Sequence, residues 1–118
     1  SLESAKHALI GKLNAITELA GGSSEVTGDY PGWAYRKDSP LRDKMVALYE
    51  KMYGVAPRVE AIHAGLECGI LGSKIRDLDC VSIGPQMTAI HTTEETLSIS
   101  STRRIWEYLV ALLEEKDK

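Results

Sequence analysis

The sequence predicts an α/β fold in which helices cover a partial sheet of parallel or mixed strands. Two short apolar runs, at residues 58–62 and 80–83, have the length and composition of buried strands, and Gly84-Pro85 ends the second run. About 16 residues separate the runs, which suits a helical crossover between parallel strands and is too long for a tight hairpin. Amphipathic segments before, between and after the runs supply the helices.

Composition narrows the class of protein. The 118 residues are 43% hydrophobic and 26% charged, with a net charge of −3, which is ordinary for one soluble globular core. Basic residues are scattered, so we expect no nucleic-acid partner. No apolar run approaches the ~20 residues of a membrane span, and the first residues lack the apolar core of a signal peptide. We therefore expect no membrane partner and a cytoplasmic location.

Two helices come first in the chain. Residues 5–20 carry an apolar stripe, and Gly21-Gly22 supplies a stop signal. Residues 23–30 are compatible with a short strand. Ser39-Pro40 then opens the best-specified helix, with serine as the N-cap and proline at the first helical position, and Gly54 ends it.

The second half of the chain predicts two more helices and an edge strand. Residues 66–71 form a helical segment between the two apolar runs. Residues 96–99 can form a short edge strand, and Ser100 or Ser101 caps a last helix whose apolar stripe needs a surface to cover.

Two pairs of residues leave alternatives open. Trp33 and Tyr35 follow a Pro-Gly turn and are either a ligand platform or, as we favour, linker aromatics that pack on the sheet. Cys68 and Cys80 lack CxxC spacing. The functional interpretation is that the two cysteines form a disulfide or bind a metal. The interpretation that we favour is that they are two small, buried apolar side chains.

The residues that carry candidate chemistry follow the second apolar run. His91 lies in the loop beyond Gly84-Pro85, and Glu94 and Glu95 come shortly after it. Ligands bind beyond the carboxyl ends of strands in open α/β sheets, so this loop is where a site is expected. His91 is a candidate metal ligand, and Glu94 or Glu95 could bond its second ring nitrogen or organise the loop. A lone histidine is also often only structural.

A second group of candidates follows the first apolar run. His63 and Gly65 end that run, and Glu67 stands in the first turn of the next helix. If the two runs are parallel, these residues emerge at the same edge as Gly84 and could contact a substrate. The alternative is that both residues are structural: His63 would hydrogen-bond a neighbouring carbonyl at the end of the strand, and the charge of Glu67 would stabilise the start of the helix. A zinc site needs about three protein ligands, and the chain has no HExxH and no ligand-spaced cluster of His and Asp, so if His91 binds a metal its partners lie on another polypeptide segment. The chain also lacks GxSxG, which argues against nucleophilic catalysis.

Five segments, in order over nearly the whole chain, resemble the C-terminal part of the aminoacyl-histidine dipeptidases. They are YPGW, SPLRDKM, AIHAGLECGIL, VSIGP and HTTEE. This family comprises di-zinc metallopeptidases of the M20 group that cleave Xaa-His dipeptides such as carnosine. The resemblance implies that His91 is a metal ligand and that the HAGLECG segment lines the cleft. Where the family often has Ser-Pro-Asp after the histidine, this chain has Thr92-Thr93-Glu94.

The resemblance also implies a division of the chain and a missing part. Residues 1–35 would be the last helix and strand of an inserted lid domain, and residues 36–118 the C-terminal part of the catalytic domain. The other zinc ligands and the catalytic glutamate would lie in an N-terminal segment outside this chain. We therefore expect the chain alone to be inactive, to hold zinc weakly if at all, and to self-associate into a homo-oligomer.

Two rival interpretations stay open. The first is a non-catalytic α/β binding or assembly module that shares the peptidase core. The second is a different M20 exopeptidase, such as a tripeptidase, which substrate profiling of the whole enzyme would distinguish.

Overall fold

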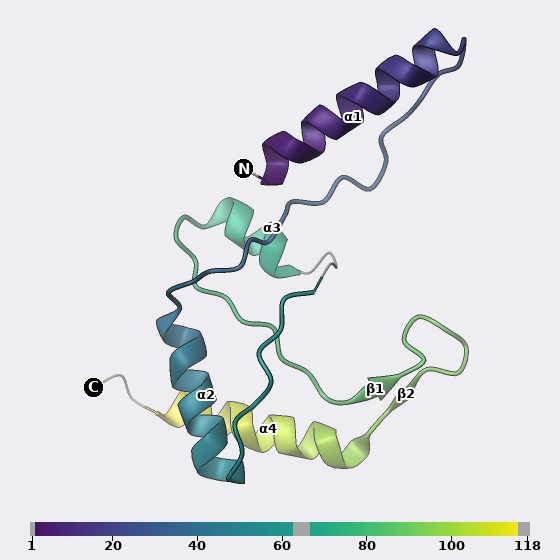
Figure 1. Cartoon of the computed structure of the whole chain (residues 1–118). Helices are drawn as coiled ribbons and strands as arrows, with labels where there is room; N and C mark the ends of the chain where they lie inside the picture. The colour runs from purple at the N-terminus through teal and green to yellow at the C-terminus, as the bar shows by residue number, and fades with distance from the viewer. Residues whose placement is uncertain (1, 63–66, 116–118) are drawn as a thin grey trace. The chain divides into compact units, whose positions relative to one another are not determined.

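A computed structural model describes residues 2–62 and 67–115 (Figure 1). Within them lie four helices and two short strands, and none of these helices is long and apolar enough to cross a membrane. In order, the elements are α1 (Leu2–Leu19), α2 (Pro40–Tyr53), α3 (Glu67–Lys74), β1 (Met87–Thr88), β2 (Thr96–Leu97) and α4 (Ile99–Glu114). The chain divides into two compact units, one of residues 1–37 and 61–78 and the other of residues 38–60 and 79–118.

In the first unit, α1 is tied to the segment that follows it. Lys6 Nζ lies 2.6 Å from Asp29 Oδ1 and 2.7 Å from Glu3 Oε2, and Gly32 N donates to Glu3 Oε1 at 2.6 Å. The hydrogen bond from Lys6 lowers the pKa of Asp29. As predicted, α1 stops before the Gly21-Gly22 pair: it ends at Leu19, and Gly21 has a left-handed φ of 78°. Residues 23–30 form no strand with any described residue.

Helix α3 contacts the Pro-Gly turn of the same unit through a glycine. Gly69 is buried, and a Cβ at this position would lie 2.6 Å from Pro31 O and 3.6 Å from Trp33 Cβ. Only glycine therefore permits this close approach. Trp33 is 38% exposed and Tyr35 63% exposed, so the two aromatics of the predicted linker are only partly covered.

In the second unit, α2 begins and ends as predicted. Ser39 is its N-cap and accepts a hydrogen bond from Arg42 N, while Pro40 is its first residue. Gly54 adopts a φ of 73° and its N–H donates to Glu50 O at 2.8 Å. Both ends follow from local chemistry, because serine satisfies an orphan N–H and glycine adopts the left-handed conformation without a Cβ penalty.

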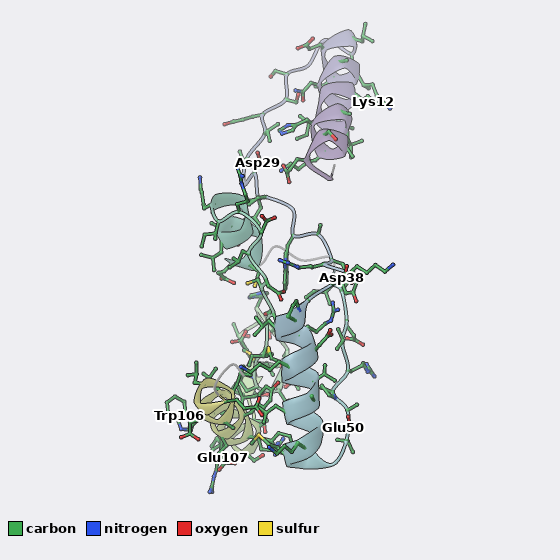
Figure 2. All side chains as sticks on the ribbon, turned by 90° about the vertical axis from the view of Figure 1, so that its left-hand side faces the viewer. Lys12, Asp29, Asp38, Glu50, Trp106 and Glu107 are labelled. Atoms are coloured by element: carbon green, nitrogen blue, oxygen red, sulfur yellow. The ribbon has the colours of Figure 1, made fainter. Side chains whose placement is uncertain are left out.

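The core of the second unit lies between α2 and α4. Met45 and Leu48 of α2 and Tyr108 of α4 are its buried apolar residues among those described. The Tyr108 hydroxyl donates to Met45 O at 2.6 Å, and its ring packs edge-on against Tyr49 with centroids 5.5 Å apart. Trp106, on the far side of α4, points away from α2 (Figure 2) and is 66% exposed.

The predicted parallel strands are the main correction. Neither residues 58–62 nor residues 80–83 pair as strands with any described residue, and the sheet that forms is an antiparallel hairpin of β1 and β2. Met87 pairs with Leu97 and Thr88 with Thr96, so the first half of the predicted edge strand at 96–99 is confirmed. A strand exists only with a hydrogen-bonded neighbour, and the two apolar runs do not serve as neighbours for each other.

Smaller differences concern the last helix and the cysteines. The N-cap of α4 is Ser98, whose side chain accepts from Ser101 N, instead of the predicted Ser100 or Ser101. Ser98 is the N-cap because it directly follows β2, so α4 begins immediately after the hairpin. Cys68 and Cys80 form no disulfide, and both are only partly buried, whereas the favoured interpretation has them buried.

Candidate functional site

The hairpin loop between β1 and β2 presents His91. Its backbone is unusual, because Ala89 and His91 have positive φ values of 50° and 66°, which cost non-glycine residues on the order of 1 kcal/mol each. Hydrogen bonds across the loop compensate for that strain. Thr92 donates to Ala89 O through both its N–H, at 3.2 Å, and its hydroxyl, at 2.7 Å.

A carboxylate completes the bracing of the loop. Glu95 Oε2 accepts from the His91 backbone N–H at 2.8 Å, and the Glu94 N–H donates to the Thr92 hydroxyl at 3.2 Å. Glu95 therefore organises the loop through the backbone of His91 and not through its ring. That is one of the two roles predicted for this pair of glutamates.

His91 lies at the surface of the hairpin loop. It is exposed, and no residue of the described ranges forms a hydrogen bond with the ring. Nor do those ranges contain a cluster of three or more His, Cys, Asp or Glu side chains that could hold a metal. His91 therefore fits as one ligand of a zinc ion, whereas a catalytic zinc site usually has three protein ligands.

The other predicted site residues fall into different parts of the chain. His63 and Gly65 lie outside the described residues. Glu67 is the first residue of α3, exposed, in the first unit. Partial burial, with Glu67 and Cys68 nearby, raises the pKa of Tyr30. Gly84 and His91 belong to the second unit, so convergence of all these residues on one substrate stays a prediction.

Beside Gly84 the second unit has a small cavity that the sequence did not reveal. It encloses about 150 Å³ and is lined by Tyr49 and Tyr53 of α2 and by Gln86, Ser101, Arg104 and Ile105. The Tyr53 hydroxyl donates to Arg104 O at 2.9 Å, which links two of the lining residues. The signal for this cavity in the sequence is a pair of tyrosines one helical turn apart, Tyr49 and Tyr53.

Comparisons with known proteins place the chain inside larger ones. No protein-family profile matches it. It is 35% identical over 114 residues to the cytosol non-specific dipeptidase of Escherichia coli (strain K12), covering 97% of this chain and 24% of that protein. The crystal structure of an aminoacylhistidine dipeptidase from Vibrio alginolyticus superposes with a TM-score of 0.73 at 38% identity, again over 97% of this chain and 24% of the other. The chain thus spans about a quarter of the length of these relatives.

Proposed function

We propose that this chain, which is homologous to part of the aminoacylhistidine dipeptidases, forms one segment of a metal-dependent dipeptidase and supplies His91 to its metal centre. Both similar proteins are named as dipeptidases, which supports a dipeptidase over a tripeptidase. The remainder of the enzyme would supply the other metal ligands and the general base. Dipeptides, including those of the Xaa-His type, would be its substrates.

The observation that carries this proposal is how the loop presents His91. A metal-binding imidazole must be accessible and must keep a fixed position, because ligand geometry decides affinity. The His91 ring is exposed, while its backbone N–H is held by Glu95 in a left-handed conformation. A histidine with only a structural role would direct its ring to a neighbour within the fold.

These residues fit a metal site to which this chain contributes one ligand, and not a site that this chain forms alone. His91 would be one protein ligand of a zinc ion, with Glu95 fixing the loop behind it. When bound, zinc polarises a peptide carbonyl and lowers the pKa of a bound water. One imidazole cannot hold the ion tightly in competition with water, so the chain alone would bind zinc weakly and be inactive.

The alternative function is a non-catalytic binding or assembly module. The cavity lined by Tyr49, Arg104 and Gln86 supports it, since residues of the second unit line this cavity without help from another chain. A binding or assembly module would not require a hydrogen-bonded loop that holds the His91 imidazole at the surface. We therefore rank it second.

The test measures zinc binding and hydrolysis together. Calorimetric zinc titrations and hydrolysis of carnosine and Ala-Ala are run on this chain, and on this chain mixed with the expected N-terminal segment taken from the Escherichia coli relative. We expect zinc binding and hydrolysis only in the mixture, and loss of both in His91→Ala. Thr93→Ala, an exposed change in the same loop, is the matched control and should keep both. Tight zinc binding by this chain alone, or a mixture without His91-dependent hydrolysis, would refute the proposal.

A further inference from the structure

The cavity of the second unit has the size of one small molecule. It encloses about 150 Å³ and is lined by residues of α2, of α4 and of the segment at 84–86. Cavities of roughly this volume accept a benzene ring in other proteins. Tyr49 and Tyr53 of α2 and Ile105 of α4 supply its apolar side chains, and the centroids of the two tyrosine rings lie 4.6 Å apart. A flat apolar group therefore fits against this wall.

The polar groups of the lining are available as hydrogen-bond donors. Ser101 is 5% exposed, and its hydroxyl oxygen accepts from Gln86 N at 2.6 Å. No described residue accepts the proton of this hydroxyl, and none forms a hydrogen bond with the Tyr49 hydroxyl or the side-chain amide of Gln86. A ligand with acceptor atoms would satisfy these groups.

Arg104 gives the cavity a positive charge. Its backbone carbonyl accepts from the Tyr53 hydroxyl, but no described residue forms an ion pair or hydrogen bond with its guanidinium. Glu107 does not line the cavity and pairs with Arg103 at 2.8 Å, and no described lining residue is acidic. One cation with several donors and no carboxylate favours an anion.

We propose that this cavity binds a small carboxylate whose apolar body, about the size of a benzene ring, lies against the tyrosines. Ser101 and Arg104 are three residues apart on α4 and therefore lie on the same face of the helix. The guanidinium would pair with the carboxylate oxygens, for which its planar fork of N–H groups is suited, and the Ser101 hydroxyl would donate to one of them. His91 is not among the lining residues, so this binding requires no metal.

The test titrates the chain with sodium benzoate and follows its backbone amides by heteronuclear NMR. We expect shifts at Gln86, Ser101 and Arg104 that saturate with a Kd of about 1–10 mM, which is the affinity expected of so small a ligand. Benzamide has the same ring without the charge and should bind about tenfold more weakly or worse.

Variants test the role of the guanidinium. Arg104→Gln should weaken benzoate binding about tenfold or more, because a charge-assisted pair is lost. Lys51→Gln is the matched control: Lys51 is exposed on α2 and outside the lining, so its removal makes the same change in net charge and should alter the Kd by no more than about twofold. Arg104 is also exposed, so circular dichroism should show the same helix content in both variants.

The outcomes decide each part of the proposal. Benzamide that binds as tightly as benzoate, or an Arg104→Gln variant with an unchanged Kd, would overturn the carboxylate site. Acetate or inorganic phosphate that binds as tightly as benzoate would overturn the role of the tyrosine wall. Loss of benzoate binding in His91→Ala would place the anion on the imidazole and overturn the proposal. Unchanged binding in that variant would support it, whatever the zinc and hydrolysis measurements show for the proposed function.

Discussion

Ser39 and Asp79 form the hydrogen-bonded pair on which the start of α2 depends, and breaking it should destabilise the second unit. Ser39 is only 3% exposed; its hydroxyl donates to Asp79 Oδ1 at 2.6 Å and accepts from Arg42 N at 3.1 Å. Asp79 Oδ2 also accepts from Leu41 N at 3.0 Å. The two side chains therefore cap the helix together.

The size of the effect follows from these bonds. Ser39→Ala removes an N-cap, about 1 kcal/mol, and a charge-assisted hydrogen bond, about 1.5–3 kcal/mol. Asp79→Ala removes two charge-assisted bonds, which we expect to cost about 3 kcal/mol or more. The double variant loses the shared bond only once, so the coupling free energy should be about 1.5–3 kcal/mol.

Urea unfolding monitored by circular dichroism at 222 nm measures all three variants. Ser82→Ala, at an exposed position of the same unit, is the control and should change the free energy of unfolding by no more than about 0.5 kcal/mol. A coupling below about 0.5 kcal/mol, with single variants near the control, would refute the joint cap.

Two further predictions concern a glycine contact and a buried tyrosine. Gly69→Ala should destabilise the contact of α3 by about 1–3 kcal/mol, because its methyl would lie 2.6 Å from Pro31 O. A methyl at Gly72 would meet nothing within 4 Å, so Gly72→Ala should stabilise the helix by about 0.5–1 kcal/mol. Thermal unfolding measures both variants, and a change of the same sign in both would contradict this prediction. Tyr108→Phe should cost about 1 kcal/mol by losing the bond to Met45 O. Burial raises the pKa of Tyr108, so stability should fall as the pH rises above about 10, where the unfolded chain ionises first, and the phenylalanine variant should show a shallower fall in urea titrations.

Features that depend on neighbouring residues were predictable from the sequence. The Ser-Pro start and glycine end of α2 are local signals, and the structure has both. The loop position of His91 was also predictable, since Gly84-Pro85 breaks the preceding run. The left-handed backbone of His91 and its bond to Glu95 were not, because no sequence pattern specifies that a non-glycine residue adopts a positive φ.

Features that depend on distant residues were also missed. Asp79 caps a helix that begins 39 residues earlier, and Gln86 bonds Ser101 across 15 residues. Such pairs arise from packing, so spacing along the chain does not reveal them.

The sequence by itself determined the helices, the resemblance to the dipeptidases and the choice of His91 as the chemical group of interest, because each depends on local pattern or on a motif in order along the chain. Tertiary structure alone decided which strands pair. Residues 80–83 have the composition of a strand, but a strand needs a neighbour with hydrogen-bonding groups at the right spacing, and no described residue provides one. β1 and β2 pair directly with each other, and the loop that joins them is held by the bond from the His91 N–H to Glu95.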